Sequence, residues 1–269
     1  MVIPVHDINP LRRTPWVTYA LVLVNVVVFL LTPGNASTVS GSMTASQQCK
    51  QLEFYDRYAA IPTELTHNHA LGEVATGQVG QDAQGKVGCV AAKPSYHKFP
   101  LLSALTSMFL HGGWLHLLGN MLFLVIFGNN VEDRMGRVKF LLFYLVSGIV
   151  AAYGFALAQP NSTETLIGAS GAIAGVLGAY LVLWPKARVW SLVPFFFFIP
   201  LRLPAWLVLG LWFVLQWVYA SGAAVSSAGN VAYFAHVVGF AFGALVGLAV
   251  RRTGGTTEPA PTRWRRPAT

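Results

Sequence analysis

The segment IGASGAIAG, residues 167–175, carries a single hydroxyl, that of Ser170, among small apolar side chains. A serine hydroxyl becomes an effective nucleophile when a neighbouring base takes its proton, and a neutral imidazole can do so near pH 7. His236 is the candidate for that base. Taken alone, however, a serine in a Gly/Ala-rich membrane helix is more often a packing residue. The chemical interpretation therefore depends on whether the fold brings the two side chains together.

Nucleophilic attack on a carbonyl group also requires donors for the oxyanion that forms. The segment HGGWLHLLGN, residues 111–120, provides His116 and Asn120, which are four residues apart and so share one face of a helix. The backbone N–H of Ser170, near the start of a helix, would add a third donor. No acidic residue is placed to orient the imidazole, so the chemistry would be that of a Ser–His dyad and not of a triad.

Other catalytic chemistries fit the sequence poorly. His111 and His116 are five residues apart, about 140° around a helix, and no Glu lies between them, unlike the H-E-x-x-H zinc motif. We therefore expect no metal site and no cofactor. The segment GASGA, residues 168–172, also differs from the G-x-S-x-G nucleophile elbow, since position 172 is Ala and no strand is predicted before it.

The composition indicates a multi-pass membrane protein, the setting in which these residues must meet. Of the 269 residues, 54% are hydrophobic and 10% are charged. We predict an all-α protein with six transmembrane helices, each an apolar stretch bounded by Pro, Gly, Asn or charged residues. The predicted spans lie near residues 16–32, 113–129, 140–158, 166–184, 205–220 and 231–250.

The distribution of basic residues predicts the orientation in the membrane. Six spans place both termini on one side, and 13 of the 18 Lys and Arg residues fall on that side. By the positive-inside rule both termini are cytoplasmic. The basic residues lie at helix ends and not along one stripe, so anionic lipid headgroups explain the net charge of +8 better than a nucleic-acid partner does.

This topology places the candidate residues at one depth. Span four would enter from outside near Leu166 and span six near Val231, which puts Ser170 about 6 Å and His236 about 7 Å below the external surface. The apolar run 189–200 is too short to span and holds Pro194 and Pro200, so we expect a helix or loop at the cytoplasmic interface. If this run crossed the bilayer, His236 would lie in the cytoplasmic half.

Two ridges of small residues predict that spans four and six touch. Small side chains at four-residue spacing allow helix backbones to approach closely in lipid. One ridge would consist of Ser170, Ala174 and Gly178, and the other of Gly239, Gly243 and Gly247. Of the remaining amides in the spans, Gln216 is interpreted as forming a hydrogen bond between helices, and Asn25 indicates no particular role.

We divide the chain into an N-terminal cytoplasmic segment (1–15), a membrane domain (16–252) and a basic cytoplasmic tail (253–269) that is predicted to be disordered. A polar external loop, residues 33–102, is inserted between the first two spans and is long enough to form a small cap. It contains both cysteines, Cys49 and Cys89, which we expect to pair in an oxidising compartment.

Four motifs in this order resemble those of the rhomboid family of intramembrane serine proteases. They are HGGWLHLLGN (111–120), which resembles H-x4-H-x3-N; VEDRMG (131–136), which resembles E-x-R-x-G; GASGA (168–172), which resembles G-x-S-G; and AHVVGFAFG (235–243), which resembles A-H-x2-G-x3-G. The resemblance covers about residues 15 to 252 and is closest to the bacterial six-span type.

The resemblance implies Ser170 as nucleophile and His236 as general base, with Asn120, His116 and Gly168 at the oxyanion site. It also implies that a transmembrane protein substrate enters laterally from the bilayer, unwinds, and is cut near the external face through an acyl-enzyme. The expected location is a bacterial plasma membrane.

Four further residues are expected to be structural. The resemblance implies that Glu132 and Arg134 hold the turn between spans two and three, and the ridge argument assigns packing to Gly239 and Gly243.

The sequence also departs from the family pattern. An aromatic residue one turn after the serine, common in the family, is replaced by Ala174, so the imidazole must be oriented by other residues. A Trp-Arg pair before the second span is replaced by PLLSA (100–104), and Gly119 stands where a bulky residue is usual. The alternative function is an inactive rhomboid-like protein that binds or escorts membrane clients, although such proteins lose the Ser or the His. A transporter is less favoured because the spans lack carboxylates.

Overall fold

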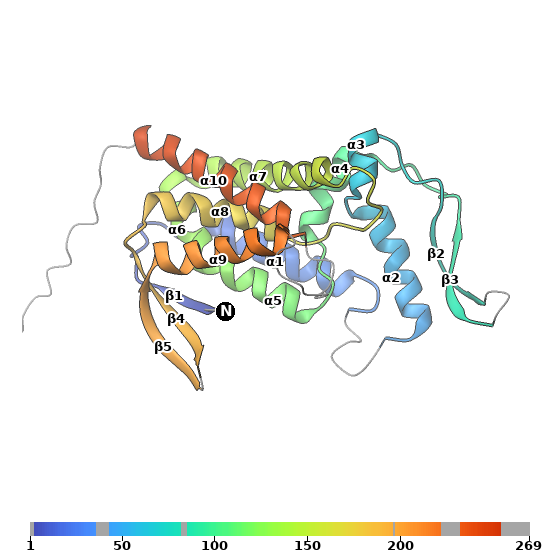
Figure 1. The fold of residues 1–269 in the computed structure, drawn as a ribbon, viewed down its shortest axis with the longest axis horizontal. Coiled ribbons are helices and arrows are strands. Elements are labelled where there is room, and N and C mark those ends of the chain that lie inside the picture. The colour runs from blue at the N-terminus through green and yellow to red at the C-terminus, as the bar shows by residue number, and fades with distance from the viewer. Residues whose placement is uncertain (1–2, 36–42, 82–84, 196, 222–231, 254–269) are drawn as a thin grey trace, which may run out of the picture.

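The structure, a computed structural model, describes residues 3–35, 43–81, 85–195, 197–221 and 232–253, and it is mostly helical. Apolar helices form a bundle (Figure 1), and a helix occupies each range predicted as a span. These helices are α1 (Trp16–Leu31), α5 (Trp114–Phe123) with its continuation through a π-helical turn (Leu124–Gly128) into α6 (Asn129–Met135), α7 (Arg137–Ala158), α8 (Ser170–Leu183), α9 (Ala205–Ala220) and α10 (Tyr233–Thr253).

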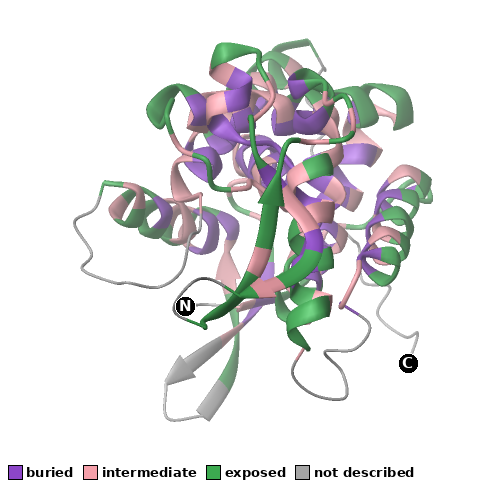
Figure 2. Ribbon diagram, turned by 90° about the vertical axis from the view of Figure 1, so that its right-hand side faces the viewer, coloured by how far each residue is buried: buried purple, intermediate pink, exposed green. Residues whose placement is uncertain are grey.

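Three helices of the described residues are long and apolar enough to cross a membrane. They are Trp114–Met135, Arg137–Ala158 and Tyr233–Thr253. The helices α1, α8 and α9 are apolar but shorter, at 14 to 16 residues. The buried residues gather inside the bundle (Figure 2).

Helices α8 and α10 pack along glycines that allow backbone contact. A Cβ atom on Gly239 would lie 2.3 Å from the carbonyl oxygen of Gly171, and one on Gly243 would lie 1.8 Å from that of Gly175. A Cβ on Gly247 would lie 3.0 Å from the Cα of Ala179. The predicted contact between the helices is present, but the ridge on α8 differs from the prediction.

The ridge that faces the α10 glycines is Gly171, Gly175 and Ala179, one position after the predicted Ser170, Ala174 and Gly178. The closest approach falls where α8 has no Cβ, which is at Gly171 and Gly175. Gly178 still contacts α10, at the backbone of Phe240. The residues that face the α10 glycines are thus one position later than predicted, although Ser170 and Gly178 of the predicted ridge also contact α10.

A three-stranded antiparallel sheet lies at one end of the bundle, so the protein is mostly helical, as predicted, but not all-α. Its order is β1 (Ile3–Asp7), β4 (Arg188–Phe195) and β5 (Phe197–Pro204). The run 189–200 is thus neither a helix nor a loop but most of a hairpin. Prolines disfavour a helix there, while its β-branched and aromatic residues favour strands.

A buried polar group fixes the N-terminal strand to the bundle. Asp7 accepts hydrogen bonds from the Tyr180 hydroxyl of α8 and, at 2.8 Å, from the Asn130 amide of α6. Burial raises the pKa of Asp7 above its ordinary value, an effect that these hydrogen bonds oppose. The segment before α1 is therefore tied to the same helix that begins at Ser170.

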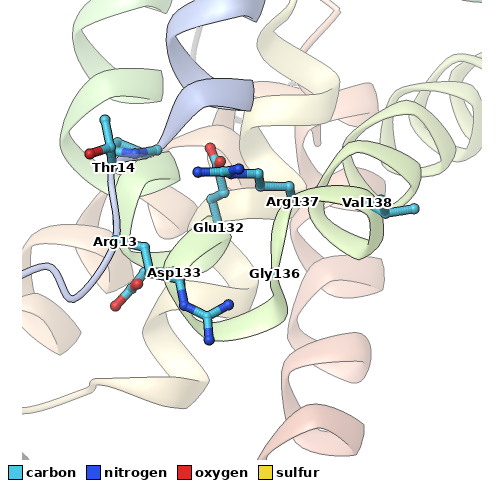
Figure 3. A pocket seen from close by; sticks show the side chains of 8 residues that line it. Arg13, Thr14, Glu132, Asp133, Gly136, Arg137 and Val138 are labelled. Carbon is cyan, nitrogen blue, oxygen red and sulfur yellow. The ribbon is translucent and has the colours of Figure 1, made fainter.

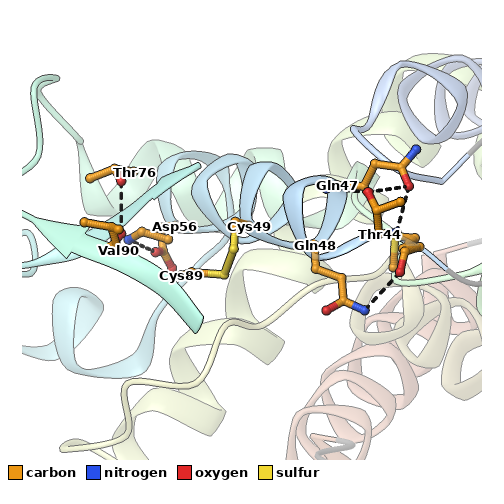
Figure 4. Close-up of a disulfide and its surroundings, with 10 residues drawn as sticks. Thr44, Gln47, Gln48, Cys49, Asp56, Thr76, Cys89 and Val90 are labelled. Carbon is orange, nitrogen blue, oxygen red and sulfur yellow. Dashed lines mark hydrogen bonds between the residues drawn. A yellow bond between two sulfur atoms is a disulfide. The ribbon is translucent and has the colours of Figure 1, made fainter. Parts of the chain in front are cut away.

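The segment between α1 and α5 forms a cap at the opposite end of the bundle from the three-stranded sheet (Figure 1). It contains α2 (Ala45–Tyr58), α3 (Pro62–His67), a hairpin of β2 (Val74–Gln81) and β3 (Val87–Ala92), α4 (Pro100–Thr106) and a 3-10 turn (Ser107–Phe109). A disulfide between Cys49 and Cys89 joins α2 to β3 (Figure 4).

A buried ion pair lies within the cap. Lys98 Nζ lies 2.6 Å from Glu64 Oε2, with both side chains almost fully buried. Burial lowers the pKa of Lys98, although Glu64 opposes the shift. Removing one partner from such a pair leaves a buried charge uncompensated, which costs about 3–5 kcal/mol.

Candidate active site

The structure brings Ser170 and His236 together from two helices. Ser170 is the first residue of α8, and His236 lies in the first turn of α10. The Oγ of Ser170 and the Nε2 of His236 are 2.7 Å apart, a hydrogen-bond distance. His236 is 9% exposed and Ser170 is half-buried. The packing of α8 on α10 therefore places a hydroxyl against an imidazole.

Helix α8 begins later than the span predicted from residue 166. The residues before Ser170 are not helical, and the N–H of Leu166 donates to the carbonyl of Ala60 in the cap at 2.7 Å. This hydrogen bond to the cap keeps the residues before Ser170 out of a helical conformation. Because N–H groups in the first helical turn have no acceptor within the helix, the backbone N–H of Ser170 can donate to a bound group.

The second imidazole nitrogen of His236 has a partner that the sequence interpretation missed. Its Nδ1 lies 2.7 Å from Oε1 of Gln216, a buried residue of α9. The only sequence signal for this role was a polar side chain within a membrane helix, where such groups are costly and often functional. Asn25 gave the same signal, but its amide donates to the carbonyl of Leu21 in its own helix.

The chain has no aromatic residue at position 174, but the rings of Trp212 and Tyr233 lie beside the imidazole of His236. The Trp212 ring centroid lies 6.0 Å from that of His236, with 34° between the ring planes, and the Tyr233 ring meets it edge-on at 6.4 Å. Ala174 is fully buried. The imidazole is thus contacted by α9 and by the start of its own helix.

His116, Asn120 and Gly168 form a corner beside Ser170, which we call the oxyanion corner. A Cβ at Gly168 would lie 2.8 Å from His116 Nε2 and 3.6 Å from Asn120 Nδ2, so both nitrogens point at a space that only glycine leaves open. The φ of Gly168, +121°, is also a conformation that other residues rarely adopt. Among the described atoms Asn120 Nδ2 is buried without a hydrogen-bond acceptor.

The proton of His116 is directed toward this corner. The N–H of Gly112 faces His116 Nδ1 at 3.5 Å, the long end of hydrogen bonding. A ring nitrogen that accepts a hydrogen bond carries no proton, so this contact favours the tautomer with the proton on Nε2. Both His116 and Asn120 can then donate to an anion at the corner.

The cap fixes the chain on both sides of this corner. The carbonyl of His111 accepts hydrogen bonds from Asn35 Nδ2 at 3.1 Å and from the Tyr55 hydroxyl at 3.0 Å. Burial raises the pKa of Tyr55 to about 12, which keeps this donor protonated. On the other side, the N–H of Thr63 donates to the carbonyl of Ser162 at 3.0 Å. The cap therefore anchors the segments that precede α5 and α8.

The remaining predicted residues lie at the sheet end. The carboxylate of Glu132, predicted to hold the turn between α6 and α7, accepts hydrogen bonds from the N–H groups of Val17, at 3.0 Å, and Thr18, at 2.7 Å, and so caps the start of α1. A surface pocket lies beside it (Figure 3), lined by Arg13, Thr14, Pro15, Glu132, Asp133, Gly136, Arg137 and Val138. Arg134 follows on α6, and its role stays a prediction.

Within the described ranges the structure contains no group of three or more His, Cys, Asp or Glu residues that could hold a metal ion. The site itself provides a hydroxyl against an imidazole, with amide, imidazole and backbone N–H donors nearby.

Comparison with known proteins gives a consistent assignment. The Rhomboid domain family model matches residues 98–253. The chain is 29% identical over 196 residues to RHOMBOID-like protein 6, mitochondrial, of Arabidopsis thaliana, a match that covers 71% of this chain and 60% of that protein. It is 30% identical over 169 residues to RHOMBOID-like protein 1 of the same plant, covering 62% of this chain and 39% of the relative.

A third relative is named as a protease. Rhomboid-like protease 3 of Toxoplasma gondii is 35% identical over 100 residues, which cover 36% of this chain and 37% of that protein. Each match thus spans less than two thirds of the relative's length. The family model covers more than half of the chain and includes Ser170, His236 and the oxyanion corner. The chain is an integral membrane protein that belongs to the rhomboid family.

Proposed function

We propose that the protein is an intramembrane serine endopeptidase that cuts transmembrane segments of other membrane proteins. The observation that carries the proposal is the 2.7 Å contact between Ser170 Oγ and His236 Nε2, beside the buried amide nitrogen of Asn120. Relatives in the family include proteins named as proteases. We assign the residues their roles as part of this proposal.

In the acylation step, the Oγ of Ser170 attacks the scissile carbonyl carbon while His236 Nε2 takes the hydroxyl proton. The carbonyl oxygen becomes an oxyanion that accepts hydrogen bonds from Asn120, His116 and the backbone N–H of Ser170. One such donor can contribute about 3 kcal/mol to the transition state. The imidazolium then gives its proton to the leaving amine, and an acyl-enzyme remains.

In the deacylation step, His236 takes a proton from water, and the resulting hydroxide attacks the ester carbonyl. The same donors stabilise the second oxyanion, and the proton returns to Ser170 as the new carboxyl group departs. The substrate must be unwound at the cleaved bond, because a helical carbonyl is already hydrogen-bonded and shielded by its own helix. Small residues at the cleavage site would allow this approach.

We further propose a six-span topology for residues 16–252 with both termini in the cytoplasm and the active site toward the external side. The 13 basic residues on the terminal side support this orientation. The pairing of β1 with β4 is in line with it, since both segments are expected on the cytoplasmic side. A bacterial plasma membrane is the proposed location. Residues 254–269 of the proposed tail lie outside the described residues.

The test is cleavage by the purified full-length chain in detergent micelles, with several reporters that each carry a transmembrane segment. We expect Ser170→Ala and His236→Ala to lower the rate by about 10⁴-fold or more. Ser147→Ala is the matched control, because the Ser147 hydroxyl donates at 2.7 Å to the carbonyl of Phe143 within its own helix. We expect it to cleave at the wild-type rate.

The alternative function, a rhomboid-like protein that binds or escorts membrane clients without cutting them, gives a different result. The wild-type chain would then cleave no reporter while still binding one of them. Equal cleavage by wild type and Ser170→Ala would instead exclude the Ser–His dyad.

A further inference from the structure

We infer that Gln216 is a positioning residue for the dyad, which accepts the Nδ1 proton of His236 and so leaves Nε2 free to take the proton of Ser170. The inference rests on the proposed function, because it concerns how the base of that reaction is prepared. It adds a residue from a third helix, α9, to a site otherwise built by α5, α8 and α10.

The hydrogen-bond pattern carries the inference. The two ring nitrogens of His236 each have one partner at 2.7 Å: Ser170 Oγ at Nε2 and Gln216 Oε1 at Nδ1. An amide oxygen only accepts, so this contact favours the tautomer that carries its proton on Nδ1. A neutral imidazole carries one proton, which leaves Nε2 as the acceptor for the serine hydroxyl. The opposite tautomer would place a proton on Nε2 and prevent general-base catalysis.

A neutral amide suits this position better than a carboxylate would. Gln216 is 8% exposed and His236 is 9% exposed. A carboxylate in the place of Gln216, as in a Ser-His-Asp triad, would therefore be a buried charge within the membrane domain. Burying a charge costs several kcal/mol, whereas an amide oxygen accepts the same hydrogen bond at lower cost. The amide also remains an acceptor when His236 becomes an imidazolium, since Nδ1 keeps its proton.

Helix α9 also contacts the face of the ring. Trp212 lies one turn before Gln216, so the two side chains share a face of α9. The centroid of the Trp212 ring lies 6.0 Å from that of the imidazole, and the amide oxygen of Gln216 contacts the imidazole at Nδ1. Together they orient the ring in a chain that has Ala174, and no aromatic residue, one turn after the serine.

The experiment combines kinetics with a direct view of the tautomer. Gln216→Leu removes the acceptor at similar size, and Gln216→Glu restores one. We expect Gln216→Leu to lower kcat by about 10- to 100-fold, the range of one buried hydrogen bond, with KM within about twofold of wild type. Gln216→Glu should recover most of this loss. The matched control is Asn25→Leu, because Asn25 is a buried membrane amide bonded at 2.7 Å to Leu21 of its own helix.

The tautomer is read on the wild-type chain, so this part of the test does not depend on how a variant folds. In the ¹⁵N spectrum of histidine-labelled protein, assigned with His236→Gln, we expect the proton of His236 on Nδ1. A proton on Nε2 would overturn the inference. So would wild-type kcat in Gln216→Leu in preparations where Ser170→Ala is inactive. Activity of Ser170→Ala would be a failure of the proposed function and not of this inference alone.

Discussion

The two halves of the candidate site differ in how their polar atoms are satisfied. In the dyad half, both nitrogens of His236 have hydrogen-bond partners at 2.7 Å. In the oxyanion corner, Asn120 Nδ2 is buried without an acceptor among the described atoms. A buried donor without a partner costs about 1–3 kcal/mol. In the proposed reaction the dyad would therefore be organised before substrate binds, and the developing oxyanion would supply the acceptor for Asn120 Nδ2.

The two halves also depend on different parts of the fold. The dyad is set by backbone contact between α8 and α10, where Gly239 and Gly243 leave no room for a side chain. The corner combines His116 and Asn120 of α5 with non-helical chain: Gly168 has a φ of +121°, and the cap holds the His111 carbonyl through Asn35 and Tyr55. Helix packing therefore brings Ser170 and His236 together, whereas the cap holds the chain that leads into the corner.

The largest effect is expected from separating α8 and α10. In Gly243→Ala the new Cβ would lie 1.8 Å from the Gly175 carbonyl oxygen, so the helices must move apart by more than 1 Å. Since a misplacement of about 1 Å can cost about 100-fold in rate, we expect kcat to fall by about 1000-fold or more. Overpacking should also cost about 1–3 kcal/mol of stability. Reporter cleavage and thermal unfolding measure the two effects.

Gly210→Ala is the matched control for this variant. A Cβ on Gly210 of α9 would meet no atom within 4 Å, and alanine favours a helix more than glycine does. We expect unchanged cleavage and equal or greater stability. If the two alanine variants cleave at the same rate, the dyad does not depend on the approach of α8 to α10.

A smaller effect is expected from removing a donor of the oxyanion corner. Asn120→Ala should lower kcat by about 100- to 1000-fold, while KM changes little, because the donor acts on the transition state. It should not destabilise the protein, since Asn120 Nδ2 has no partner to lose. Leu118→Ala, at an exposed position of α5, is the control. A rise in KM at constant kcat would show that Asn120 binds the ground state instead.

The smallest effect is expected at the face of the imidazole. An aromatic pair contributes about 0.5–1.5 kcal/mol beyond burial, so Trp212→Leu should lower kcat by about 2- to 12-fold and Trp212→Phe by less. Trp217→Leu, at an exposed position of the same helix, should leave kcat unchanged. A loss at Trp212 as large as that at Asn120 would mean that the ring does more than orient the base.

Much of the fold could be predicted from the sequence because lipid imposes strong rules. Apolar stretches of the right length produced a helix in every range predicted as a span. The four rhomboid motifs identified the family, which the family model confirms. Glycine at four-residue spacing on α10 was sufficient to predict its contact with α8, although the α8 residues that face these glycines are one position later than predicted.

The predictions failed where tertiary contacts decide the local structure. The run 189–200 is apolar, but its strands form because β1, from the other end of the sequence, pairs with β4. The start of α8 moves to Ser170 because Leu166 bonds to Ala60 of the cap. Gln216 and Asn25 are indistinguishable in sequence, and only the fold places one of them against His236.

The central claim is that Ser170 is a nucleophile activated by His236. The most direct measurement is covalent labelling of the detergent-solubilised chain with a fluorophosphonate, followed by mass spectrometry of its peptides. The account predicts one adduct, on Ser170, which disappears in His236→Ala although the serine remains. Labelling at another residue, or equal labelling of Ser170 in His236→Ala, would contradict it.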